Sequence, residues 1–262
     1  MNFQFASMEG RRVLLTGAGP NIGRQIAVTL ARAGAELALN DINPESLQGT
    51  VDAVKAVGGK TYGVVADVSN PDQVQSMIKE VRSNFGPLDG LVNNAAITIR
   101  KGVLDSSYED WVSVLNISLT SVFLVGQACV KGMIEDKIEK GSIVNIASTS
   151  AHRGRKNAAA YCSAKAGVLN LTRCMAVEFA SIGIRVNSVT PTRSGNPVGE
   201  RIDGGRAPVG IPLGRLGEPQ DQANAVLFAL SHDAAFITGI DIPVDGGTLS
   251  MAMGMSGEKS VT

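Results

Sequence analysis

The chain has 262 residues, of which 44% are hydrophobic, and its 24 basic side chains are balanced by 24 acidic ones. A chain of this length can enclose the core of one large α/β domain. The formal net charge of zero argues against nucleic acid as a partner, because non-specific nucleic-acid binding needs a basic surface. No run approaches the ~18 consecutive apolar residues that a membrane-spanning helix requires, so we expect no membrane partner either.

Residue types that build disulfides and metal centres are scarce. Cys129, Cys162 and Cys174 are an odd number and lack CxxC spacing, which favours reduced thiols over disulfides. The chain has two histidines, His152 and His232, and we predict no metal site. Residues 1–10 show neither the basic region nor the long apolar region of an export signal, so the cytoplasm is the expected compartment.

Short apolar runs rich in β-branched residues alternate with longer stretches of helical periodicity. The expected strands are residues 13–15, 37–40, 61–66, 91–93, 143–146, 185–189 and 240–244. The expected helices are residues 23–33, 44–57, 71–85, 108–138, 158–181 and 220–230. Strands this short and apolar are typical of a sheet buried on both faces. The alternation predicts a single-domain α/β fold, a Rossmann-type doubly wound parallel sheet of about seven strands with helices on both faces and right-handed crossovers.

Local signals mark where some of these elements begin. Asn43 before Pro44 and Asn70 before Pro71 are the pattern of a helix N-cap followed by proline at the first helical position. Residues 191–217 break the alternation, since they are rich in Gly, Pro and Arg and have no clean periodicity. This segment is either a plain connection or a lid over an active site.

The first expected strand leads directly into a glycine-rich turn, TGAGPNIG at residues 16–23, and a helix follows. Glycine at a strand-to-helix turn lets the backbone approach a pyrophosphate, and the helix N-terminus supplies free N–H groups. The alternative is a tight turn that binds no ligand. The strand–turn–helix context favours a dinucleotide site.

Asp41 ends the second expected strand, 18 positions after Gly23. A carboxylate at this point accepts hydrogen bonds from the adenosine ribose and repels a 2′-phosphate. Neither Pro20 nor Asn21 in the turn is an arginine that could bind such a phosphate. The sequence therefore predicts NAD in preference to NADP, although Asp41 could instead only decorate the start of the next helix.

Tyr161 and Lys165 lie four residues apart on an expected helix, with Ser148 thirteen residues before Tyr161. Residues at this spacing share one helix face, so both side chains can point into one cleft. A free phenol has a pKa near ~10, and a nearby ammonium group favours the phenolate. We therefore expect Lys165 to lower the pKa of Tyr161 toward the range that suits a general acid or base.

Taken in order along the chain, these motifs resemble those of the classical short-chain dehydrogenase/reductase family, from residue 13 to residue 247. The ordered set is the glycine turn, Asp41, Asn93-Asn94-Ala95, Asn116, Ser148, Tyr161 with Lys165, and Val244-Asp245-Gly246-Gly247. The resemblance implies an NAD-dependent oxidoreductase that interconverts a secondary alcohol and a ketone. The alternative is a catalytically idle NAD-binding regulator or scaffold on the same fold.

The resemblance also implies roles for individual residues. Tyr161 would exchange the proton, Ser148 would hydrogen-bond the reacting oxygen, Lys165 would hold the nicotinamide ribose, and Asn116 would help carry a proton-relay water. The expected cofactor contacts are Gly17, Asn21, Ile22, Gly23, Asp41, Ile42, Asp67, Val68, Asn93, Ala95, Tyr161, Lys165, Pro191 and Thr192. In this family the helix at 158–181 packs against its symmetry mate, so we expect a homodimer or homotetramer.

Three positions depart from the family pattern. Asn21 replaces a glycine of the turn, and asparagine is one of few other residues that tolerate a left-handed backbone. Ala96 replaces the glycine that often follows Asn-Asn-Ala, and Thr192 replaces the glycine after Pro191. The residues after Thr192 lack the family's threonine at its usual offset, which leaves the contact to the nicotinamide carboxamide unassigned.

The substrate is indicated less specifically. Residues 95–135 are similar to family members that act on sugar acids such as gluconate, although reductases of thioesters, cyclic ketones and steroids share the same motifs. Arg153, Arg155 and Lys156 fall between Ser148 and Tyr161. They are either solvated loop charges or a binding site for an anionic substrate.

Overall fold

The structure, a computed structural model, describes residues 6–192, 194 and 210–251. Seven parallel strands form one sheet in the order β3-β2-β1-β4-β5-β6-β7. The strands are β1 (Arg12–Thr16), β2 (Glu36–Asp41), β3 (Thr61–Val65), β4 (Gly90–Asn93), β5 (Ser142–Ile146), β6 (Arg185–Pro191) and β7 (Asp241–Val244). The predicted seven-stranded, Rossmann-type doubly wound sheet is confirmed.

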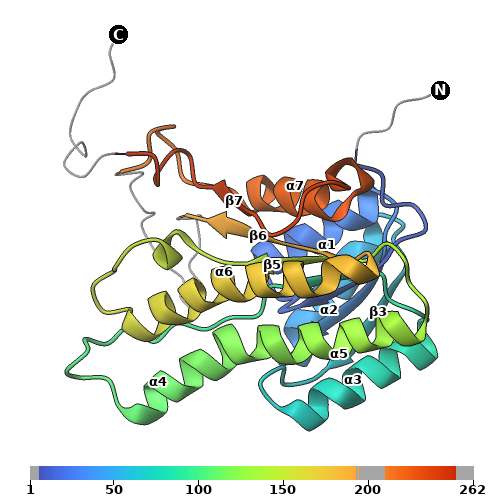
Figure 1. Ribbon diagram of the computed structural model, residues 1–262, viewed down its shortest axis with the longest axis horizontal. Coiled ribbons are helices and arrows are strands. Elements are labelled where there is room, and N and C mark those ends of the chain that lie inside the picture. The colour runs from blue at the N-terminus through green and yellow to red at the C-terminus, as the bar shows by residue number, and fades with distance from the viewer. Residues whose placement is uncertain (1–5, 193, 195–209, 252–262) are drawn as a thin grey trace.

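Helices cover both faces of the sheet (Figure 1). One face carries α1 (Ile22–Arg32), α2 (Pro44–Ala56) and α7 (Pro219–Leu230). The other face carries α3 (Pro71–Asn84), α5 (Ser121–Glu135) and α6 (Ala159–Phe179), with α4 (Tyr108–Leu115) leading into α5. Successive residues of β1, such as Val13 and Leu14, alternate between the two cores. The central strands carry apolar side chains on both faces because both faces are buried.

The β6–β7 connection departs from the predicted handedness. The chain crosses the sheet in one direction from β4 through β5 and β6 to β7. The helices α5 and α6 make the first two of these crossovers on one face, whereas α7 makes the third on the other. The last crossover therefore has the opposite hand, and the expectation of right-handed crossovers throughout is wrong here. Residues 192–218 join β6 to α7, a stretch long enough to carry the chain to the far face.

The predicted helix starts at Asn43 and Asn70 are confirmed. The Asn43 side chain accepts a hydrogen bond from the backbone N–H of Ser46 at 2.8 Å. Asn70 accepts from the backbone of Asp72 and Gln73 at 3.0 and 3.1 Å. Each cap satisfies N–H groups that have no partner within the helix.

The helix expected at residues 108–138 is interrupted. A π-helical turn, η1 (Asn116–Thr120), separates α4 from α5. The sequence has neither proline nor glycine at this point, which is why periodicity alone predicts one continuous helix. The whole stretch Tyr108–Glu135 is long and apolar enough to span a membrane. In this fold it is a core helix, since α5 packs its apolar side chains against α3 and the sheet.

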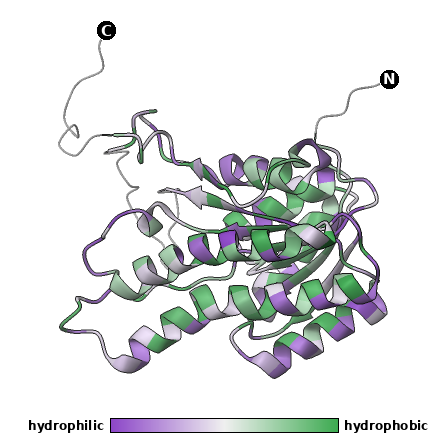
Figure 2. Ribbon diagram, viewed as in Figure 1, coloured by the Kyte–Doolittle hydropathy of each residue, from purple (hydrophilic) through white to green (hydrophobic). Residues whose placement is uncertain are grey.

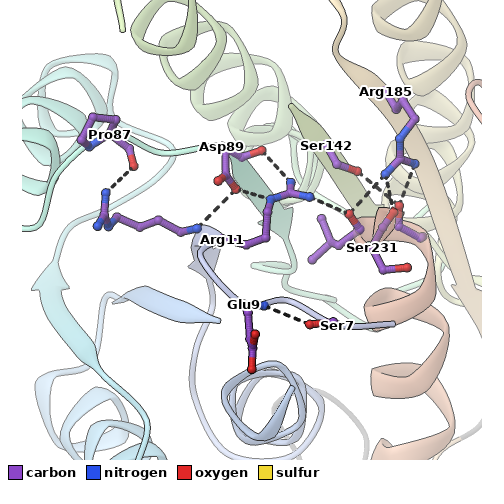
Figure 3. Close-up of polar contacts among 11 residues, drawn as sticks. Ser7, Glu9, Arg11, Pro87, Asp89, Ser142, Arg185 and Ser231 are labelled. Atoms are coloured by element: carbon purple, nitrogen blue, oxygen red, sulfur yellow. Dashed lines mark hydrogen bonds and ion pairs between the residues drawn. The ribbon is translucent and has the colours of Figure 1, made fainter. Parts of the chain in front are cut away.

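At the edge of the sheet where the strands begin, arginine side chains form an ion pair and hydrogen bonds to backbone carbonyls (Figure 3). Arg11 forms an ion pair with Asp89 at 2.7 Å and donates to the carbonyl of Leu230. Arg185 donates to the carbonyls of Ala229, Leu230 and Ser231 at the end of α7, and to that of Ile237. Burial, together with the charge of Arg11, lowers the pKa of Arg185 to about 10. These guanidinium groups satisfy carbonyls that the helix leaves without a partner.

Candidate active site

The predicted site residues lie at the opposite edge of the sheet, where the strands end. Thr16, Asp41 and Pro191 are the last residues of β1, β2 and β6. Ser148 follows β5 by two residues and begins the short 3₁₀ helix η2 (Thr149–Ala151). In an open α/β sheet this is the edge at which ligands bind.

Glycines make the turn between β1 and α1 unusually tight. A Cβ atom on Gly17 would lie 2.7 Å from the Cα of Ala95, and one on Gly23 would collide with the Gly17 carbonyl. The turn therefore needs glycine at both positions, and it lies directly against the end of β4. The arrangement fits the pyrophosphate of a dinucleotide, which needs close approach to a backbone.

The N-terminus of α1 differs from those of α2 and α3. Asn21 stands at its N-cap position but provides no side-chain cap, and the first turn holds no acidic residue. The backbone at Asn21 has φ +75° and ψ −125°. The positive φ agrees with the expectation for Asn21, but this ψ lies outside the left-handed helical region and in one that favours glycine. Asn21 therefore holds a strained turn in front of an uncapped helix.

Asp41 lies beside this turn. Its Oδ2 would be 3.0 Å from a Cβ built on Gly19, and its Oδ1 accepts from the backbone of Asn43 at 2.9 Å. The neighbouring Ile42 is exposed. At the end of β3, the Asp67 carboxylate accepts from the backbone and hydroxyl of Ser69. Asp41 and Asp67 thus border the part of the edge where a bound adenosine would lie.

The Asn93 side chain has a structural role, and its contact with the cofactor stays a prediction. Its side chain is buried, and its amide donates to Asn145 at 2.9 Å, which in turn donates to Thr172. These bonds tie β4, β5 and α6 together beneath the site. The next residue, Asn94, donates to the Gly17 carbonyl at 2.7 Å and so braces the glycine turn. Sequence reasoning assigned no role to Asn94, although its place in the Asn-Asn-Ala motif was the available signal.

Ser148, Tyr161 and Lys165 converge on one point. The Ser148 hydroxyl lies close enough to the Tyr161 phenol to act on its pKa. The Lys165 Nζ lies 5.9 Å from the centre of the Tyr161 ring and donates to the Ile146 carbonyl at 2.6 Å. Lys165 is only 2% exposed, and the hydrogen bond to the last residue of β5 fixes its ammonium group near the phenol ring.

Burial acts on the pKa values of both Tyr161 and Lys165. Burial raises the pKa of Tyr161, while the hydrogen bond from Ser148 and the charge of Arg155 oppose that rise. Burial also lowers the pKa of Lys165 to about 8. The Lys165 ammonium group is directed to the Ile146 carbonyl, with its Nζ 5.9 Å from the centre of the phenol ring. That Lys165 lowers the pKa of Tyr161 toward the range of a general acid or base stays a prediction.

Asn116 begins the π-helical turn next to this trio. Its backbone carbonyl accepts from the N–H of Ser121, five residues on, which is the bond that defines the turn. The turn packs on α6, where a Cβ on Gly167 would lie 2.8 Å from the Leu119 side chain. Asn116 is itself exposed, and within the described residues no hydrogen bond joins it to Ser148, Tyr161 or Lys165. π-helical turns of this kind occur frequently at functional sites.

The remaining predicted contacts are placed only in part. Val68 is buried after β3, Pro191 is the last residue of β6, and Thr192 follows it. Most of the expected lid at 191–217, including residues 193 and 195–209, lies outside the described residues, as does the chain beyond residue 251. Within the described ranges, no group of three or more His, Cys, Asp or Glu residues could hold a metal ion.

Comparison with known proteins agrees with this geometry. A family model described as enoyl-(acyl carrier protein) reductase matches residues 17–248. A 3-oxoacyl-[acyl-carrier-protein] reductase from Thermotoga maritima is 35% identical over 92% of this chain and 98% of its own length. A (2S)-[(R)-hydroxy(phenyl)methyl]succinyl-CoA dehydrogenase subunit from Thauera aromatica is 38% identical over 92% and 97%.

A solved structure of a short-chain type dehydrogenase/reductase from Mycobacterium marinum superimposes with a TM-score of 0.85. It is 34% identical, and the match covers 93% of this chain and 97% of that one. The chain belongs to the short-chain dehydrogenase/reductase family. Members of this family are oxidoreductases that bind a nicotinamide cofactor, and the resemblance seen in the sequence is confirmed.

Proposed function

We propose that this protein is an NAD-dependent oxidoreductase that interconverts a secondary alcohol and a ketone. The observation that carries the proposal is the convergence of Ser148, Tyr161 and Lys165 at the carboxyl edge of the sheet, beside a glycine turn that fits a dinucleotide. A protein that only bound the cofactor would have no need of a phenol, a hydroxyl and a buried ammonium at one point.

The chain's own groups would hold and move the proton. Ser148 orients the substrate oxygen, and the Tyr161 phenolate takes the hydroxyl proton of the alcohol during oxidation. In the reverse direction the Tyr161 phenol gives its proton to the carbonyl oxygen. Asn116, on the neighbouring turn, would position a water that relays the proton. A bound nicotinamide supplies the hydride chemistry itself.

Asp41 supports NAD as the cofactor. Its carboxylate lies beside Gly19, where it would face the adenosine ribose and repel a 2′-phosphate. Arg24, in the first turn of α1, donates to the Thr50 hydroxyl at 3.2 Å, which directs its guanidinium toward α2. The contacts inferred for Gly17, Asn21, Ile22 and Gly23 belong to the same proposal.

The proposal does not specify the carbon skeleton of the alcohol or ketone. The two curated relatives described above are named for different thioesters, and the sugar-acid expectation stays a prediction. The direct test is to add NAD or NADP with a panel of secondary alcohols and follow formation of the reduced cofactor at 340 nm. We expect reduction of NAD with at least one of the alcohols. Tight binding of NAD without turnover of any alcohol or ketone would favour the idle binding protein instead.

A further inference from the structure

The loop between η2 and α6 carries positive charge that no acidic group in the described chain neutralises. Arg153, Arg155 and Lys156 are all exposed, and none of the three forms an ion pair with a described residue. Lys101, on the neighbouring loop, is by contrast paired with Asp110 at 2.6 Å. Figure 2 shows the loop before α6 as a hydrophilic segment at the carboxyl edge of the sheet.

This loop is held in place at both ends. His152 hydrogen-bonds Asp241 of β7 at 3.0 Å, and the same carboxylate accepts from the hydroxyls of Ser188 and Thr190. At the other end, Asn157 adopts a left-handed backbone with φ +57° immediately before α6 begins. The cationic side chains lie between the His152 hydrogen bond and this turn, after Ser148 and before Tyr161 in the sequence.

A second loop lies against this one. A Cβ on Gly102 would be 3.7 Å from the Asn157 side-chain oxygen and 2.9 Å from the Asp105 carboxylate. The tip of this second loop is apolar and open, since Val103 is 77% exposed and Leu104 is 99% exposed. The loop that carries the cations and the loop with the exposed apolar tip therefore lie side by side, and the Asp105 carboxylate belongs to the second of them.

We propose that Arg155 binds an anionic group of the substrate, so that the molecule oxidised or reduced at Tyr161 carries a carboxylate or a similar anion. The inference rests on the proposed function and deepens it. A guanidinium binds a carboxylate through two parallel hydrogen bonds, which fixes orientation as well as position. The charge of Arg155 already acts at the phenol, where it lowers the pKa of Tyr161. Arg155 is exposed on the loop that leads into α6, six residues before Tyr161, so its guanidinium can bind part of a molecule that reaches the phenol.

The test compares secondary alcohols offered as matched pairs of acid and methyl ester, such as 3-hydroxybutyrate and methyl 3-hydroxybutyrate. We expect kcat/KM for the acid to exceed that for the ester by about tenfold or more. Arg155→Gln should remove this preference and move the pH profile of oxidation to higher pH. Arg173→Gln, which removes the same charge from an exposed position farther along α6, should keep both. Added salt should weaken the preference, because exposed charges are screened over ~8 Å at physiological ionic strength.

A second measurement needs no turnover and separates this inference from the proposed function. The same acids are titrated against the protein loaded with NADH, and we expect Arg155→Gln to bind them about tenfold more weakly than the parent. Failure to oxidise any alcohol would count against the proposed function only. The anion site is overturned if esters are used as well as acids, or if Arg155→Gln and Arg173→Gln bind the acids equally.

Discussion

The two edges of the sheet use charged side chains in opposite ways. At the edge where the strands begin, Arg11 and Arg185 direct their guanidinium groups to an aspartate and to the last carbonyls of α7. At the edge where the strands end, the loop before α6 presents Arg153, Arg155 and Lys156 without an ion pair in the described chain. The first arrangement completes the fold, and the second keeps hydrogen-bonding capacity available to a ligand.

The helix N-termini at the carboxyl edge repeat the contrast. Asn43 and Asn70 cap α2 and α3, whereas α1 has no side-chain cap and no acidic residue in its first turn. A capped helix end has its N–H groups satisfied by the protein, and an uncapped one can bind phosphate oxygens. Variants at the two edges should therefore separate activity from stability.

The largest expected effect is on activity at the carboxyl edge. Tyr161→Phe removes the phenol hydroxyl and keeps the ring, so turnover should fall by ~10²–10⁴-fold. The affinity for NAD and the urea midpoint should stay close to those of the parent. Steady-state rates and a cofactor titration on the same preparation check this. Residual activity above a tenth of the parent would mean that another group moves the proton.

At the edge where the strands begin, we expect a substitution to lower stability and to leave activity unchanged. Arg185→Met removes the hydrogen bonds to Ala229, Leu230, Ser231 and Ile237. Leaving several carbonyls without partners should lower the free energy of unfolding by about 3 kcal/mol. The kcat per folded molecule should not change. A fall in kcat with unchanged stability would contradict the separation of the two edges.

Burying the charge of Lys165 at the active site should lower the free energy of unfolding. Burial lowers the pKa of Lys165 to about 8 in the folded protein, against ~10.4 in the unfolded chain. The charged form is thus disfavoured by folding, and the penalty is full below pH ~8 and fades as the pH rises to ~10.4. Lys165→Met should abolish turnover and stabilise the protein at pH 7 by about 2 kcal/mol. Urea unfolding at pH 7 and pH 10 checks this, since the gain should shrink at the higher pH.

Cofactor choice tests the adenosine end of the same edge. NAD should bind at least ten times more tightly than NADP, a preference of about 1.4 kcal/mol, and Asp41→Ala should reduce it severalfold. Asp52→Ala is the control, because this exposed carboxylate lies on α2 away from the turn. Equal affinities for the two cofactors in the parent would refute the role of Asp41.

The sequence allowed the sheet, its strands and the order of the site residues to be predicted, because short buried strands and residue spacing are local patterns. Three features escaped it for physical reasons. The π-helical turn at Asn116 has no proline or glycine to announce it. The position of α7 depends on a long connection rather than on local pattern. The direction of the Lys165 ammonium group, toward the Ile146 carbonyl, is set by tertiary packing that spacing cannot reveal.

The smallest expected effect concerns Asn21 and sharpens the comparison of helix ends. Asn21 has φ +75° and ψ −125° and gives α1 no cap, whereas Asn43 has φ −96° and caps α2. Glycine adopts the backbone of Asn21 without strain, while strain of this kind costs on the order of 1–3 kcal/mol for other residues. Glycine also loses more entropy on folding, so Asn21→Gly should stabilise the protein by about 1 kcal/mol.

The same change at Asn43 should have the opposite sign, because Asn43→Gly removes a cap from a helix end that has no strain to relieve. Urea midpoints of the two variants, measured side by side, compare two identical substitutions at two helix starts. If both lower the midpoint, the backbone at Asn21 is not strained. If Asn21→Gly raises it and leaves the affinity for NAD intact, the asparagine is a tolerated departure from glycine rather than a requirement of the cofactor site.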